Sequence, residues 1–145
     1  MKDFISSLIQ IIKFIKLKKE KKKFVFFSES KFYIYHFESL IDELLKLNQS
    51  DIYYLCLDKK DYNFYKKKIN CIFISNKFFL QIIFSTLECK YLILTLTGLG
   101  SNLVKSKKCD KFIYFFHALA STHKIYTKDA FKNYDIVFTN GNYQK

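Results

Sequence analysis

With 145 residues, the chain has the length of one ordinary domain, because single hydrophobic cores typically enclose about 100 to 200 residues. Half of its residues are hydrophobic and 26% are charged, which excludes a wholly disordered chain and provides enough apolar surface for a core. The chain has no proline and 3 glycines, which excludes collagen and proline-rich linkers and predicts short connections between elements.

The net charge is strongly positive and comes from lysine alone. The formal charge is +12, and all 25 basic residues are lysines. Arginine is the residue most used for bidentate contacts to phosphate and guanine, so a lysine-only chain is an unusual reader of nucleic-acid sequence. The charge predicts an anionic partner, either a phosphorylated polymer or an acidic membrane surface. Sequence-independent binding of nucleic acid is a third possibility, although no recognition motif supports it.

The four cysteines do not form a metal-binding pattern. Cys56, Cys71, Cys89 and Cys109 are at least 15 residues apart and lack the CxxC or CxxH pairs that hold zinc. We therefore expect free thiols in the core, in a reducing cytoplasm, and no metal site. No apolar run reaches the roughly 20 residues that span a bilayer. Lys13 interrupts the first such run, which is not typical of a signal peptide.

The leading segment, residues 1–23, is predicted to contain an amphipathic helix over residues 4–17 with a basic end. Its apolar residues recur at helical spacing, and a run of lysines follows them. One interpretation is a helix that docks on the domain core, with lysines that complement the negative end of its dipole. The other is a helix that lies in a membrane interface. The apolar positions are Ile5, Leu8, Ile9, Ile12 and Ile15, and the expected membrane-contact residues are Lys18, Lys19, Lys21, Lys22 and Lys23.

Residues 24–145 are predicted to form a single α/β domain. Short apolar runs rich in β-branched and aromatic residues predict six strands, at residues 24–27, 52–57, 71–74, 91–96, 112–116 and 136–138. Helical patterns occur at residues 35–47, 77–87 and 128–134. Strands that alternate with helices and are apolar on both faces are typical of a sheet covered on both sides. We therefore expect an open, doubly wound, Rossmann-like sheet that is mainly parallel.

The loops at the carboxyl ends of these strands are the expected ligand site, as in other open α/β sheets. They are residues 28–31, 58–61, 97–108 and 117–124, where polar side chains concentrate. Loop 97–102 (TGLGSN) holds two of the 3 glycines, so its backbone could approach a phosphate closely. The alternative is an ordinary glycine turn, because the loop is not GxGxxG and does not follow the first strand.

His117 directly follows the predicted strand at residues 112–116, where a ligand is expected. An imidazole with a pKa of about 6.5 can accept a proton from an attacking hydroxyl at neutral pH. Nearby Ser121, Thr122 and Lys124 could hold phosphate oxygens, and the alternative is a histidine that bonds to the backbone at a helix start. His36 lies between aromatic residues and is predicted to be packed or partly exposed.

Several segments resemble one enzyme family. Residues 114–126 (YFFHALASTHKIY), followed by Asp129-Ala130-Phe131 and Tyr134-Asp135, are similar to the CDP-glycerol glycerophosphotransferases, the teichoic-acid polymerases and primases. Residues 24–29 (FVFFSE), 40–44 (LIDEL) and 105–108 (KSKK) resemble the amino-terminal half of the same family. The resemblance covers residues 24 to about 140, within the predicted α/β domain.

The resemblance implies the first lobe of a two-lobed unit with a glycosyltransferase-B-like fold. Such enzymes move glycerol phosphate from CDP-glycerol to a hydroxyl of a lipid-linked or polymeric acceptor, at the cytoplasmic face of the plasma membrane. The family's essential first-lobe histidine matches His117, which we expect to act as general base. The resemblance implies no metal and no cofactor, since CDP-glycerol is a substrate. The residues expected to orient the acceptor or its phosphate are Ser28, Glu29, Ser121, His123 and Lys124.

The chain also departs from the family. Ser30 stands where family members usually have glycine, and Thr97-Gly98-Leu99 replaces an acidic or proline-containing loop. The sequence ends at residue 145, where the family continues into a second lobe that supplies most of the nucleotide site. We therefore expect an incomplete catalytic unit: a fragment, a piece of a split enzyme that needs a separate second-lobe chain, or a lobe with a binding role. The alternative function is a non-catalytic module that binds a membrane or an anionic polymer.

Overall fold

The computed structural model describes residues 2–16, 21–29, 34–101, 103–116, 126–139 and 141. The helices are α1 (Lys2–Lys16), α2 (Ile34–Lys46), α3 (Lys59–Tyr65) and α4 (Lys77–Thr86). The strands are β1 (Lys22–Ser28), β2 (Ile52–Cys56), β3 (Asn70–Phe73), β4 (Cys89–Leu94), β5 (Cys109–Phe115) and β6 (Ile136–Phe138).

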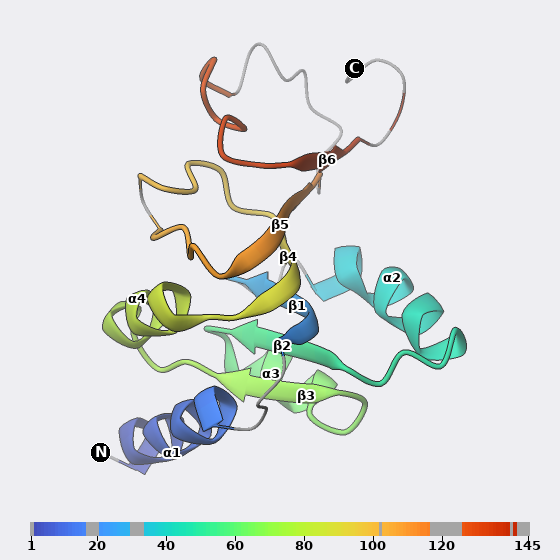
Figure 1. Cartoon of the computed structure of the whole chain (residues 1–145). Coiled ribbons are helices and arrows are strands. Elements are labelled where there is room, and N and C mark those ends of the chain that lie inside the picture. The colour runs from blue at the N-terminus through green and yellow to red at the C-terminus, as the bar shows by residue number, and fades with distance from the viewer. Residues whose placement is uncertain are drawn as a thin grey trace.

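The six strands form one sheet in the order β3-β2-β1-β4-β5-β6 (Figure 1). Every neighbouring pair is parallel. The chain therefore runs outward from β1 to one edge, returns, and runs outward to the other edge, which is the doubly wound order of Rossmann-like sheets. The predicted α/β class and open parallel sheet are confirmed.

Alternate residues of each strand enter two separate cores because side chains point to opposite faces of a sheet. Phe27 joins the core under α1 and α4, where its ring lies 5.2 Å from that of Phe84. Phe26 joins the core under α2 and α3 and lies 5.3 Å from the ring of Phe37. Full burial of a side chain of this size contributes about 1.5–3 kcal/mol. Both faces are therefore covered, as the continuous apolar strands require.

α1 packs on the face that carries α4 and also caps the edge strand β3. Ile11 and Phe14 are buried in the core of this face. Ser7 is buried and donates its hydroxyl to the Phe73 carbonyl at 3.0 Å, while Gln10 accepts from the Phe73 N–H at 3.1 Å. α1 thereby satisfies polar groups at the edge of the sheet, where unpaired backbone would invite association with other chains. None of the helices in the described ranges is long and apolar enough to cross a membrane.

Two predicted elements differ from the structure. Residues 58–61, expected as a loop, instead begin α3: Asp58 is its N-cap and accepts from the Lys60 N–H at 2.6 Å. Residues 128–134, expected as a helix, instead form consecutive turns with bonds three residues apart, such as Tyr134 N–H to the Phe131 carbonyl at 3.0 Å. Seven residues are too few for a stable isolated helix, and tertiary packing of Phe131 and Tyr134 on Tyr114 decides the conformation.

Candidate functional site

Several strands bring their carboxyl ends to one edge of the sheet. In the register of the sheet, Ser28 pairs with Cys56, and Leu94 pairs with both Phe27 and Tyr114. Ser28, the residues after Leu94 and the end of β5 therefore lie at the same level. This edge is where Rossmann-like domains bind ligands, and we describe it as the carboxyl edge.

A buried polar cluster lies at the β1–β2 end of the carboxyl edge. Asp61, in the first turn of α3, is 0% exposed. Its Oδ2 accepts from the Tyr54 hydroxyl at 3.0 Å and from the Ser28 hydroxyl at 3.3 Å. Its Oδ1 is buried and has no hydrogen-bond partner among the described residues. A buried carboxyl oxygen without a donor is costly in free energy and is uncommon in folded proteins.

Burial also changes the ionisation of this cluster. It raises the pKa of the Asp61 carboxyl, and the hydrogen bonds from Tyr54 and Ser28 only partly offset that effect. Burial raises the pKa of the Tyr54 hydroxyl as well, so Tyr54 acts as a neutral donor. The Oδ1 atom of Asp61 is a hydrogen-bond acceptor enclosed by the protein, and it can become a donor when the carboxyl is protonated.

Ser28 is a site residue predicted from the sequence, and Asp61 is not. Ser28 is fully buried at the end of β1, where it is bonded to Asp61. Asp61 was within the expected loop at residues 58–61, and no role was predicted for it. The available signal was an N-cap aspartate directly after a buried strand, with a second acid three residues later in the first turn. Only the structure shows that the second acid points into the sheet.

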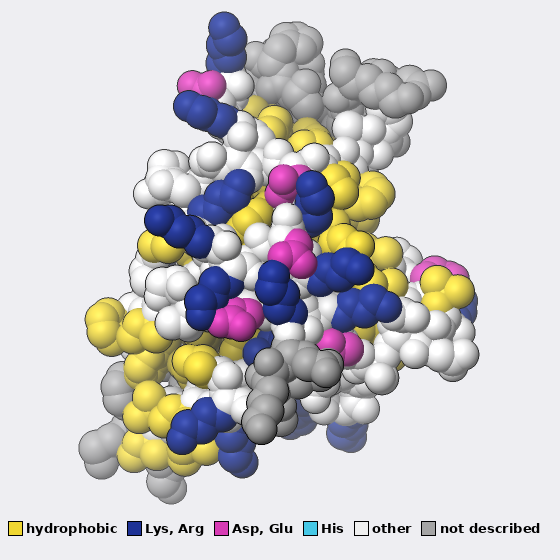
Figure 2. Space-filling model, viewed as in Figure 1, with side chains coloured by type: hydrophobic (Ala, Val, Ile, Leu, Met, Phe, Trp, Pro, Cys, Tyr) yellow, Lys and Arg dark blue, Asp and Glu magenta, His cyan; other side chains and the backbone are white. Residues whose placement is uncertain are grey.

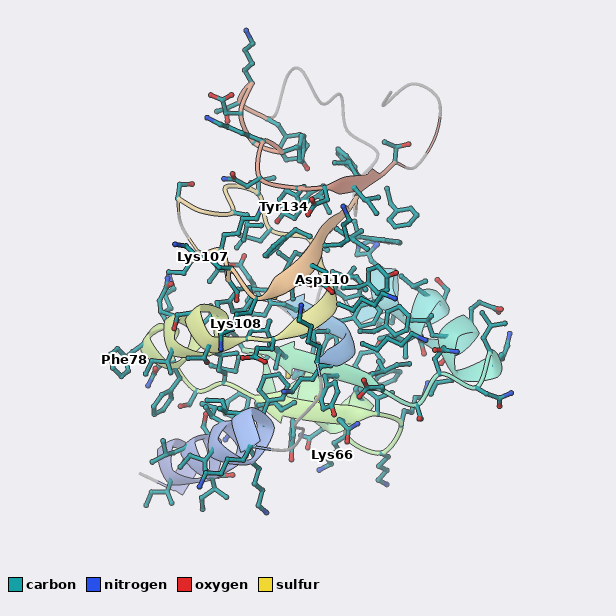
Figure 3. All side chains as sticks on the ribbon, viewed as in Figure 1. Lys66, Phe78, Lys107, Lys108, Asp110 and Tyr134 are labelled. Atoms are coloured by element: carbon teal, nitrogen blue, oxygen red, sulfur yellow. The ribbon has the colours of Figure 1, made fainter. Side chains whose placement is uncertain are left out.

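Glu29 is exposed and follows Ser28 directly at the same edge. It interacts electrostatically with Tyr134, whose pKa is raised first by burial and then by the Glu29 charge. Tyr134 lies between the connection that precedes β6 and the loop after β4 (Figure 3). Its hydroxyl donates to the Leu96 carbonyl. Glu29 is therefore a charge on the solvent side of the carboxyl edge, next to the loop that follows β4.

The glycine loop after β4 is closed by bonds within the chain. Gly98 and Gly100 have φ values of 73° and 89°, in the region that favours glycine. Their N–H groups donate to the Ala130 carbonyl at 3.4 Å and the Leu103 carbonyl at 2.7 Å. A side chain at Gly100 would meet the Asn133 amide nitrogen at 2.7 Å. These contacts favour the interpretation as a glycine turn over a phosphate-binding loop.

Four expected site residues, His117, Ser121, His123 and Lys124, lie outside the described residues. Phe116, which precedes His117 in the sequence, is buried, and its N–H donates to the Phe138 carbonyl at 3.2 Å. Its ring centroid lies 4.9 to 5.8 Å from those of Tyr114, Tyr126 and Phe131, with which it forms an aromatic cluster at the end of β5. This cluster packs the end of β5 at the carboxyl edge.

The five expected membrane-contact lysines differ in where the structure places them. Lys18 and Lys19 lie outside the described residues. Lys21 is exposed and forms an ion pair with Asp110 at 2.5 Å. Lys22 does not meet the expectation of a surface residue: it is 5% exposed, and its ammonium lies 4.4 Å from the centre of the Phe14 ring. β1 begins at Lys22, so the pleat of the strand turns this side chain toward α1.

Lys23 is partly buried, with its ammonium bonded to the Gln49 side chain. Its backbone N–H donates to Asp51 at 2.7 Å. Lys21 and Lys23 are thus tied to neighbouring elements at the amino end of β1, on the opposite edge from the buried Asp61 cluster.

The four cysteines are free thiols that form two close pairs. The Sγ atoms of Cys89 and Cys109 are 3.1 Å apart on neighbouring strands, and those of Cys56 and Cys71 are 3.9 Å apart. The contact with Cys109 and burial raise the pKa of the Cys89 thiol. Among the described residues, no group of three or more His, Cys, Asp or Glu side chains could hold a metal ion.

The fold and this edge define a Rossmann-like α/β domain with a buried carboxyl group where such domains bind ligands. No family model, no curated protein and no solved structure matches the chain. The functional assignment therefore depends on the residues of this chain and on the resemblance of residues 114–126 described above.

Proposed function

We propose that the chain is the first lobe of a phosphotransferase that moves glycerol phosphate from CDP-glycerol to a hydroxyl of a lipid-linked or polymeric acceptor. The observation that carries this proposal is the place of the resemblance within the fold. The resemblance begins at Tyr114 within β5, and the carboxyl end of β5 lies at the edge where Ser28 and Asp61 meet. In a Rossmann-like sheet this edge binds ligands, which supports a ligand role for the residues that follow β5 in the sequence.

In the proposed reaction, the acceptor hydroxyl oxygen forms a bond to the phosphorus of the glycerol phosphate group. The bond between that phosphorus and the oxygen bridging to the CMP phosphate breaks, and CMP leaves. His117 takes the hydroxyl proton as general base. Because phosphoryl transfer needs little covalent help from the protein, most of the catalysis is positioning and charge stabilisation. Ser28, Glu29, Ser121, His123 and Lys124 are the proposed orienting residues.

Asp61 adds a specific binding group to this proposal. Its unpaired Oδ1 can accept a hydrogen bond from a polyol hydroxyl, which is the group that a glycerol-based acceptor presents in quantity. Such a bond would remove the free-energy cost of the unpaired oxygen only when ligand is bound, so it favours a polyol over an apolar ligand. Nucleotide binding is assigned to a second lobe, so turnover of CDP-glycerol requires that lobe.

Transfer is best tested in cells that contain the rest of the enzyme. The gene is deleted from the source cells and replaced by the wild-type, His117→Ala or His36→Ala version. Membranes from each strain are then supplied with labelled CDP-glycerol, and label in the membrane-bound polymer is counted. We expect His117→Ala to lose about 100-fold or more of the transfer, the contribution of a general base. His36→Ala, a matched control on α2, should retain it.

Two outcomes would contradict the proposal. Equal incorporation in the deletion strain and the wild type would exclude the chain from the transfer reaction. Equal loss with His117→Ala and His36→Ala, at equal protein levels, would remove the assignment of His117 as general base and leave only a structural need for histidine.

A further inference from the structure

α1 has two apolar faces, and the sheet covers only one of them. The buried face consists of Ser7, Ile11 and Phe14, at the spacing of successive helical turns. At 100° per residue, the centre of a second apolar stripe lies about 135° around the helix from this face. The stripe consists of Ile5, Leu8, Ile9, Ile12 and Ile15, which are 37% to 52% exposed.

The two interpretations of this helix from the sequence are therefore not exclusive. The helix docks on the core through its buried face, whereas the apolar residues predicted from the sequence form the exposed stripe. Docking leaves five large aliphatic side chains in contact with solvent along three turns. Figure 2 shows hydrophobic side chains gathered over α1, with lysines beside them. A contiguous exposed apolar patch on a small protein marks an interaction surface, whereas single exposed residues do not.

Charge identifies the partner of this stripe. Lys13 and Lys16 are exposed and lie along one side of it. The sequence contains no aspartate or glutamate between Asp3 and Glu20, so residues 4–16 of α1 contribute no acidic side chain to offset these ammonium groups. A second copy of α1 would bring lysines of like charge together across the contact. An anionic lipid surface supplies acyl chains for the stripe and phosphate groups for the lysines at the same depth.

We infer that the exposed face of α1 lies in the interface of an anionic phospholipid bilayer, with its isoleucines at the acyl boundary and Lys13 and Lys16 at the head groups. The buried face holds the α/β domain against this helix, so membrane binding and folding use different residues of one element. The inference goes beyond the proposed transfer reaction and stands whether or not the chain is catalytic.

A single tryptophan tests the position of this face directly, because the chain contains none. Ile9→Trp places the fluorophore on the stripe, and Leu47→Trp places it on an exposed residue that follows α2, on the other face of the sheet. With vesicles of phosphatidylglycerol and phosphatidylcholine, we expect a blue shift and quenching by brominated acyl chains for Ile9→Trp only. An unshifted Ile9→Trp spectrum with bound protein, or equal shifts for both variants, would overturn the inference.

Sedimentation with vesicles tests how much the stripe and the lysines contribute to membrane binding. Ile9→Ser with Ile12→Ser should weaken binding to anionic vesicles by about tenfold or more, because two aliphatic side chains no longer enter the interface. Leu47→Ser with Val104→Ser removes two other exposed aliphatic residues and should leave binding unchanged. Lys13→Gln with Lys16→Gln should weaken binding to anionic vesicles and reduce its salt dependence. Far-UV circular dichroism confirms that each variant is folded.

Three results would overturn the inference. They are wild-type binding that ignores phosphatidylglycerol content, equal losses in the stripe and control pairs, and a wild-type dimer that becomes a monomer in Ile9→Ser with Ile12→Ser. The last result would assign the stripe to a second copy of the chain. None of these experiments uses CDP-glycerol or His117, so failure here is distinct from failure of the transfer assay.

Discussion

The two ends of the carboxyl edge contrast in how they use their polar groups. At the β4–β5 end, the N–H groups of the two loop glycines donate to carbonyl groups of the chain, and Asn133 donates to the Leu99 carbonyl. At the β1–β2 end, Asp61 accepts from two hydroxyl groups on one oxygen and from no donor of the described residues on the other. The glycine loop has these N–H groups bonded within the chain, whereas one oxygen of the Asp61 carboxyl group has no partner among the described residues.

This contrast shows why motif composition alone is a weak guide to a site. Glycines mark where the backbone takes left-handed conformations, which a turn and a phosphate loop both need. Whether the donors stay available depends on which segment folds back on the loop. Here residues 130–134 do so, and they are more than 25 residues away in sequence from the loop's glycines.

The largest expected effect concerns the β1–β2 end. Asp61→Ala removes the acceptor of two buried hydroxyl groups, those of Tyr54 and Ser28, and leaves a small cavity. We expect a loss of about 2–4 kcal/mol in the free energy of unfolding, measured by urea denaturation. Asp61→Asn retains an acceptor oxygen at the same position and should cost less. If Asp61→Ala lost less unfolding free energy than Asp61→Asn, the hydroxyl groups of Tyr54 and Ser28 would have found other partners.

The next effect concerns the β4–β5 end. Gly100→Ala places a side chain at a φ of 89° and against the Asn133 amide. We expect a loss of about 2 kcal/mol, part from the backbone conformation and part from the contact. In an Asn133→Ala background the cost should fall by about half, because only the conformational part remains. An unchanged cost in that background would show that Asn133 moves aside freely.

The smallest effect is a pH dependence that separates the two ends. Because burial raises the pKa of Asp61 above its unfolded value, the folded state binds its proton more tightly than the unfolded state. The tighter binding of this proton stabilises the folded state. The stabilisation is fully present below the pKa of Asp61 in the unfolded chain, about 3.8, and is lost as the pH rises through its pKa in the folded state. Wild type should therefore lose stability relative to Asp61→Asn over this interval.

Chemical denaturation at a series of pH values measures this difference. Gly100→Ala serves as the control, since it changes no titratable group, and its stability difference from wild type should be constant over the same interval. If the difference in unfolding free energy between wild type and Asp61→Asn did not change with pH, Asp61 would have the same pKa in the folded and unfolded states.

The fold was largely predictable from sequence because its strands are apolar on both faces. Apolar runs such as residues 91–96 and 112–116 are typical of strands inside a sheet that helices cover on both faces. The misjudged elements are the short ones, α3 and residues 128–134. Their propensities are weak, so a single cap in one case and the packing of Phe131 on Tyr114 in the other decided the outcome.

The site was less predictable. Ser28 was predicted as a site residue from its position after the first strand, and the structure shows that it bonds to Asp61. Asp61 was missed because burial of a carboxyl group cannot be inferred from a lysine-flanked segment with the composition of a surface loop.

The sequence by itself determined the class of fold and the lysine-only charge, and it carries the resemblance around His117 and the expectation of a ligand at the carboxyl edge. These are properties of composition and spacing, which depend on each segment alone. Only the tertiary structure decided which side of α1 is buried, that Asn133 packs against the glycine loop, and that one Asp61 oxygen has no partner among the described residues. These depend on contacts between segments distant in the chain, where packing and hydrogen bonding outweigh local preference.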